Sequence, residues 1–120
     1  MRKDIHHNGF AIFVISIFII GFAVILPSQA QEIMPYSVRY KTIHTTAVYR
    51  DIDVKSPIIN HIQPNVKGVI LRWCLPEFPF GDFMLGGEQK RRQLLDERIC
   101  EAYIEGKRYF IRGADITPDL

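Results

Sequence analysis

The chain has 120 residues, of which 48% are hydrophobic and 23% are charged, so it has room for one small domain and not for a multidomain enzyme. Its formal net charge at neutral pH is only +2. Nucleic-acid-binding proteins of this size usually carry a clear basic excess or a basic stripe, so the charge argues against a nucleic-acid partner.

The first 30 residues have the order of a secretory signal peptide. Two basic residues precede an uncharged apolar run at 11–26, and Ser28 and Ala30 supply the small side chains that signal peptidase needs before a cut between Ala30 and Gln31. Cleavage there places the mature chain in the periplasm or outside the cell. The alternative is an uncleaved membrane anchor, which normally needs about 20 apolar residues, more than this run contains.

Beyond the cut, short runs of β-branched and aromatic residues alternate with turn signals, which predicts an all-β domain. We divide this part into an N-terminal extension, 31–40, and a β-domain, 41–120. The clearest hairpin signal is Glu105-Gly106, because glycine can take a positive φ between two strands. The predicted strands are Tyr36–Ile43, Thr45–Tyr49, Pro57–Gln63, Val69–Cys74, Ile99–Ile104 and Lys107–Ile111.

Side chains alternate between the two faces of a strand, which orients the predicted strands. Simple alternation places Cys74 on the same face as Ile70 and Arg72. It places Cys100 and Tyr103 on opposite faces of their strand. The strand that contains Cys74 is apolar on most of both faces, so we expect it to be central in the sheet.

The segment 75–98 interrupts the strand pattern. Residues 75–87 include two prolines, three glycines and, after Leu75, five large apolar residues, which predicts a long loop, and loops of this length in a compact domain are often functional. Residues 88–98 contain strong helix formers and charge pairs spaced i,i+4, which predicts one short helix. The large apolar residues of the loop are Phe78, Phe80, Phe83, Met84 and Leu85.

Large apolar side chains in a loop either cap the domain or form a surface that binds a partner. Tyr103 is a further candidate, because it lies on the strand face opposite Cys100. Trp73 and Phe110 are expected to fill the core. The candidate binding residues are therefore Phe78, Phe80, Phe83, Met84 and Tyr103.

The two cysteines, Cys74 and Cys100, both lie in the exported part, where thiols are oxidised, so we expect one disulfide. A reactive thiol or a metal-ligand pair is the alternative, but the chain has no C-x-x-C spacing, and His44 and His61 form no ligand motif. The sequence has no recognisable nucleophile–base, paired-carboxylate or phosphate-loop motif. We therefore predict a non-enzymatic protein with no cofactor and no metal.

Short motifs follow one another in order between Lys41 and Ile116. They are Ala47-Val48-Tyr49-Arg50-Asp51, Ile58–Ile62 with Lys67-Gly68-Val69, and Ile99–Ile104 followed by Glu105-Gly106, Tyr109-Phe110-Ile111 and Gly113-Ala114-Asp115-Ile116. In this order they resemble a bacterial SH3-like domain (SH3b) of the kind found in exported alphaproteobacterial proteins. The insertion at 75–98 is longer than the usual loop of this family.

The resemblance implies a small SH3-like barrel with an insertion and a disulfide between Cys74 and Cys100. It also implies binding of peptides or cell-wall components rather than catalysis. We therefore predict an exported binding module that recognises a periplasmic or envelope protein or peptidoglycan, and that meets the membrane only if its signal segment stays uncleaved. The alternative is an inner-membrane-anchored structural subunit of an envelope complex with an uncleaved N-terminal helix.

Overall fold

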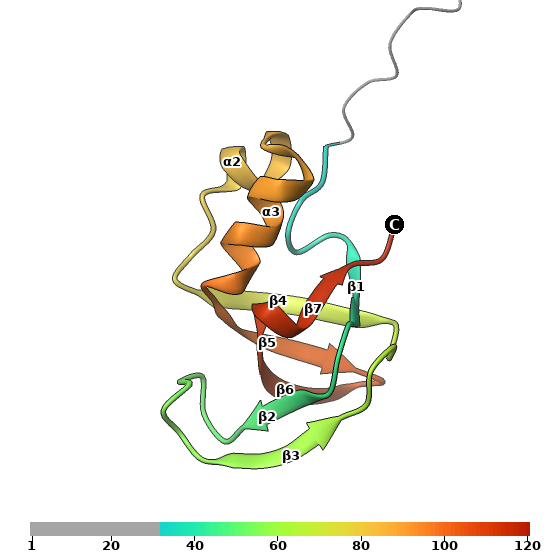
Figure 1. Ribbon diagram of the computed structural model, residues 1–120, viewed down its shortest axis with the longest axis vertical. Helices are drawn as coiled ribbons and strands as arrows, with labels where there is room; N and C mark the ends of the chain where they lie inside the picture. The colour runs from blue at the N-terminus through green and yellow to red at the C-terminus, as the bar shows by residue number, and fades with distance from the viewer. Residues whose placement is uncertain (1–31) are drawn as a thin grey trace, which may run out of the picture.

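The computed structural model describes residues 32–120, so the expected signal segment and the cut between Ala30 and Gln31 lie outside the described residues. Within 32–120, seven strands form one antiparallel sheet in the order β3-β2-β6-β5-β4-β1-β7, and helices lie on one side of it (Figure 1). The strands are β1 (Arg39–Thr42), β2 (Thr46–Tyr49), β3 (Ile58–Ile62), β4 (Val69–Leu75), β5 (Ile99–Ile104), β6 (Lys107–Arg112) and β7 (Ile116–Pro118).

This architecture confirms the mostly β character that the sequence predicts, and all six expected strands occur. The sheet is not closed, because β3 and β7 are the two ends of the strand order. β1 begins at Arg39 rather than Tyr36, because a turn precedes it in which the Ser37 N–H donates to the Met34 carbonyl (3.2 Å). The sequence pattern did not predict β7, which follows the short 3₁₀ turn η1 (Gly113–Asp115).

The β5–β6 hairpin forms where the sequence predicts it. Its two turn residues, Glu105 and Gly106, have φ angles of 51° and 80°. Two consecutive positive φ values are typical of the type I′ turn, whose twist matches that of the flanking strands. β5 and β6 pair along their whole length as a result.

A β-bulge in β4 corrects one expectation. The register with β5 shifts between Leu71 and Trp73, which leaves Arg72 as an extra residue in β4. The extra residue reverses the alternation beyond it. Cys74 is therefore fully buried on the face of Leu71, and its expected position beside Ile70 and Arg72 is wrong. The prediction that β4 is central is confirmed, because it pairs with β5 on one side and β1 on the other.

The segment 75–98 contains two helices, where the sequence predicts a loop and one helix. The expected helix is α3 (Gly87–Asp96), but α2 (Phe80–Leu85) occupies the second half of the predicted loop. A helix of six residues is too short to be stable alone. α2 is held by Phe83, which is fully buried and packs edge-on against Phe78 with ring centroids 4.9 Å apart.

The core lies between the sheet and these helices. Cys74 and Cys100 face each other across β4 and β5 and form the expected disulfide at the base of the insertion. Tyr40 and Ile33, from the region predicted as an extension, are buried in the same core. The buried cluster also contains Val48, Val69, Leu71, Phe78, Phe83, Leu94, Leu95, Ala102, Ile104, Ile111 and Ile116.

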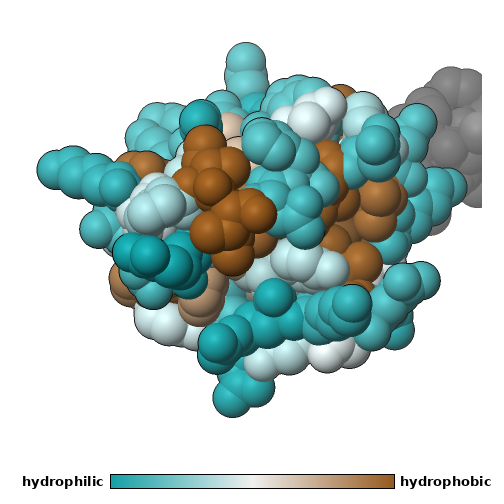
Figure 2. All heavy atoms as spheres, turned by 90° about the horizontal axis from the view of Figure 1, so that it is seen from below, coloured by the Kyte–Doolittle hydropathy of each residue, from teal (hydrophilic) through white to brown (hydrophobic). Residues whose placement is uncertain are grey.

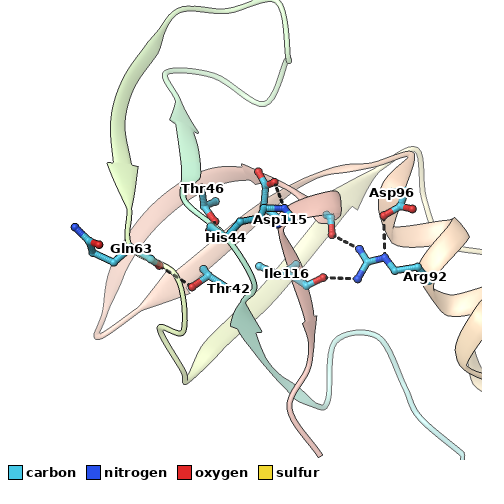
Figure 3. A network of polar contacts seen from close by, with 9 residues as sticks. Thr42, His44, Thr46, Gln63, Arg92, Asp96, Asp115 and Ile116 are labelled. Carbon is cyan, nitrogen blue, oxygen red and sulfur yellow. Dashed lines mark hydrogen bonds and ion pairs between the residues drawn. The ribbon is translucent and has the colours of Figure 1, made fainter.

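Arg92 fastens α3 to the C-terminal part of the sheet. Its guanidinium donates to the carbonyls of Gly113 and Ile116, both at 2.8 Å, and pairs with Asp96 at 2.8 Å (Figure 3). On the other side of η1, His44 Nε2 lies 2.8 Å from Asp115 Oδ1. These bonds place η1 firmly between the helix and the connection from β1 to β2.

The 3₁₀ turn η1 packs closely against the end of α3, and only glycine fits at position 113. A Cβ there would collide with the backbone carbonyl of Leu95. We expect Gly113→Ala to lower the free energy of unfolding by about 1–3 kcal/mol. Gly81→Ala is the matched control: a Cβ at Gly81 meets open space in α2, and alanine favours a helix over glycine by about 1 kcal/mol. Urea unfolding of both variants checks this, and equal effects would contradict the tight contact at Gly113.

Candidate functional site

The structure separates the five candidate binding residues. Phe78 and Phe83 are buried in the core, whereas Phe80 is 43% exposed and Met84 is half-buried. Tyr103 is also half-buried, but it lies beside the β5–β6 turn, at the opposite end of β5 from the insertion. These five residues therefore do not form one surface.

A row of four side chains crosses the sheet on the face opposite the disulfide. Trp73 of β4 lies opposite Glu101 of β5, Glu101 opposite Phe110 of β6, and Phe110 opposite Tyr49 of β2. Directly opposite residues of antiparallel strands point to the same face. We call Trp73, Glu101, Phe110 and Tyr49 the outer row.

Trp73 and Phe110 are half-buried in this row and do not belong to the core cluster, so the expectation that they fill the core is wrong. The bulge in β4 is the reason for Trp73, because the extra residue Arg72 turns its indole away from the buried face of Leu71. Aromatic side chains left half-exposed on a sheet face are available to a partner.

Glu101 is the polar centre of the outer row. Only 9% of its side chain is exposed, and the Trp73 Nε1–H donates to its Oε1 at 2.8 Å. Arg72 Nε lies 3.6 Å from the same oxygen, and an Arg108 guanidinium nitrogen lies 3.5 Å from Oε2. A carboxylate removed from water needs such partners. One buried acid thus holds two arginines at the surface, and the Arg108 guanidinium also lies over the Phe110 ring, 5.2 Å from its centroid.

Sequence reasoning missed Glu101, Arg72 and Arg108. The sequence did contain a sign that Glu101 is unusual, because this acid stands between Cys100 and Ala102 in an otherwise apolar strand. A carboxylate in a buried strand must find hydrogen-bond donors. Which donors it finds depends on the neighbouring strands, and the sequence of β5 does not contain that information.

Several hollows open on the surface of the described residues. One of about 590 Å³ lies between α3 and the last residues of the chain, where Arg92 is already bonded to backbone carbonyls. A hollow of about 390 Å³ lies between the β2–β3 connection and the start of β5. Its lining contains both acidic and basic residues, among them Asp53 and Arg112. Another, of about 220 Å³, adjoins the outer row at Tyr49 and Phe110.

A second polar cluster surrounds Tyr36 and is structural. The Cys74 N–H donates to the Tyr36 hydroxyl (3.0 Å), and this hydroxyl donates to Glu77 Oε1 (2.9 Å). Burial raises the pKa of Tyr36 to about 12, and the hydrogen bond to Glu77 acts in the same direction. Tyr36 therefore stays protonated as the donor. Beside it, the buried Arg98 donates to the Glu77 carbonyl (3.0 Å) and lies over the Phe78 ring.

The part of the chain that the structure describes holds no group of three or more His, Cys, Asp or Glu placed to bind a metal ion. Both cysteines are in the disulfide. Over residues 32–120, no helix has the length and apolar character that would span a membrane.

Comparison of the chain with protein-family models, with curated proteins and with solved structures found no match. The SH3-like assignment therefore stays a prediction from the motif order.

Proposed function

We propose that the protein is an exported, non-enzymatic binding module with an SH3-like fold that recognises a periplasmic or envelope protein or a cell-wall component. The observation that carries the proposal is the outer row. It offers the half-buried rings of Trp73 and Phe110 next to two arginines whose positions are held by the buried Glu101.

The composition of this surface favours binding. Tryptophan, tyrosine and arginine are the side chains most enriched where proteins bind one another, because they combine a large apolar area with polar groups of fixed direction. Side chains that are already oriented lose less conformational entropy on binding. Trp73 and Arg108 meet this condition, the first through its bond to Glu101 and the second through Glu101 and Phe110.

The disulfide supports the exported location. A protein of this size that carries both of its cysteines in one buried disulfide is typical of an oxidising compartment. The SH3-like part of the proposal is supported by the succession of short antiparallel strands, the tight hairpin at Glu105-Gly106 and the 3₁₀ turn before the last strand.

Capture from an envelope extract tests the proposal. We expect Trp73→Ala to lower the retained amount of a bound component at least about tenfold, because removing an aromatic anchor from the centre of an interface costs about 2 kcal/mol or more. Phe80→Ala is the matched control, since it removes an exposed ring in α2, away from the outer row. Circular dichroism must show that both variants are folded. If only the Phe80 variant lost capture, the partner would bind the insertion and not the outer row, which would contradict the proposal.

A further inference from the structure

The hollow of about 220 Å³ beside the outer row has an unbalanced charge. It is lined from β2, β3 and β6, and its charged side chains are Arg50 and Arg108, with no acidic residue among the lining. Arg50 has one distant partner, the Asp51 carboxylate at 3.8 Å, and both of these side chains are largely exposed. Arg108 shares Glu101 with Arg72, so one carboxylate faces two guanidinium groups. An excess of positive charge therefore remains at the hollow.

The size and walls of the hollow limit what it can hold. Sites for whole small molecules or cofactors are usually about 300–1,000 Å³, so a hollow of 220 Å³ suits a single side chain of a larger partner. Its lining includes the aromatic residues Tyr49, Tyr109 and Phe110, and the Phe110 ring lies under the Arg108 guanidinium. An aliphatic stem fits against such an apolar lining, and a carboxylate at the end of that stem can bind the guanidinium groups, which are shaped for carboxylates.

Strand β3 borders the hollow and is an edge of the sheet. It pairs only with β2, and four of its five residues are exposed, among them Ile58 and Ile59 with more than half of their area accessible. Proteins usually protect such an edge with charged residues or proline, and β3 contains neither. Figure 2, seen from the side of β2 and β3, shows apolar side chains gathered in patches between hydrophilic ones. An extended segment can pair with such an edge.

We propose that this hollow binds an acidic side chain of an extended segment of a partner protein, which lies along β3. The positive charge of the hollow favours a carboxylate, and its volume suits one side chain. The exposed Ile58 and Ile59 favour apolar residues next to that acidic residue in the partner segment. The inference rests on the proposed binding function and names the class of partner.

A titration with a blocked peptide, acetyl-Thr-Val-Glu-Val-Thr-amide, tests this inference on the isotope-labelled protein by nuclear magnetic resonance. We expect amide shifts in β3 and around Arg50 and Arg108. Replacing the peptide's Glu by Gln, or Arg108→Gln in the protein, should weaken binding about tenfold, the loss of one charge-assisted hydrogen bond. Arg72→Gln is the matched control, because Arg72 and Arg108 both pair with Glu101 and are 68% and 59% exposed, but Arg72 does not line the hollow.

Several results would overturn the inference. Equal affinity for the Glu and Gln peptides, or equal effects of Arg72→Gln and Arg108→Gln, would exclude the hollow as the carboxylate site. Equal affinity for free N-acetylglutamate amide would mean that a small anion is bound and no segment is recognised. Sedimentation of the free protein as a dimer that Ile59→Lys dissociates would assign the β3 edge to a second copy of the chain.

The proposed binding function is tested separately from the inference about the hollow. If the peptides do not bind but capture from the envelope extract still depends on Trp73, the inference fails and the binding function stands. If Arg108→Gln weakens peptide binding but Trp73→Ala leaves capture unchanged, the hollow is a site and the proposal that Trp73 anchors the captured partner fails. The two experiments use different probes and different variants, so their failures are distinguishable.

Discussion

Phe83→Ala should lower the free energy of unfolding by about 3–5 kcal/mol, the cost of removing a buried phenylalanine ring from a packed core. Phe83 is fully buried, and its ring packs against Phe78, which in turn lies under the Arg98 guanidinium. A six-residue helix has little stability of its own, so α2 is expected to detach when this anchor is lost. Urea unfolding measured by tryptophan fluorescence, with Trp73 as the probe, gives the change directly.

Phe80→Ala is the control for this prediction, because Phe80 stands in the same helix but is 43% exposed. Its edge-on contact with Tyr36, with centroids 6.0 Å apart, should limit its effect to about 1 kcal/mol. Equal losses in the two variants would mean that the insertion is not packed as described. A loss below about 1 kcal/mol for Phe83→Ala would mean that α2 contributes little to the core and that Phe83 is free to serve as a binding residue.

Removing the disulfide should have an effect of similar size. The bond joins cysteines 26 positions apart, and the chain-entropy model for such a loop gives about 3.5 kcal/mol. The double variant Cys74→Ala, Cys100→Ala is therefore expected to lose about that much stability. Single domains are stable by only about 5–15 kcal/mol, so this is a large share of the total.

Reduction of the wild-type protein is the control for the disulfide prediction, because it opens the same loop without replacing either buried cysteine. The reduced protein and the double variant should unfold at similar urea concentrations, both well below the oxidised protein. If the double variant lost less than about 1 kcal/mol, the packing of β4 against β5 would hold the insertion without the covalent bond. Mass spectrometry after alkylation establishes that no free thiol remains in the oxidised sample.

The positions of six of the seven strands, the hairpin at Glu105-Gly106, the helix α3 and the disulfide were predictable from the sequence. Each depends on residues close together in the chain, or, for the disulfide, on there being only two cysteines to pair. The mostly β fold followed from the same local patterns. Helix α2 was not predictable in this way, since prolines and glycines surround it and the contact that holds it, between Phe83 and the core, is tertiary.

The candidate site was largely hidden from sequence reasoning. The sequence made Phe78 and Phe83 candidates either for capping the domain or for binding a partner, because their segment has a loop-like composition, and folding buries both. It assigned Trp73 and Phe110 to the core because large aromatic residues usually fill small domains, whereas the structure places them in the outer row. Hydrophobicity alone does not tell whether an aromatic side chain is buried in the core or half-exposed on the open face of the sheet. Large apolar side chains occur in both places in folded proteins.

The sequence by itself determined where the first six strands and the longer helix lie, because the periodicity of apolar residues and the turn residues act over a few positions. It also determined which thiols pair, because it contains only two cysteines. Only the tertiary structure decided which side chains meet. The bulge at Arg72 reverses the face of every later residue in β4, and the pairing of β2 with β6 brings Tyr49 to Phe110 across more than half of the domain's sequence. Register and bulges follow from packing between distant segments, so the outer row and its neighbouring hollow exist only in the folded chain.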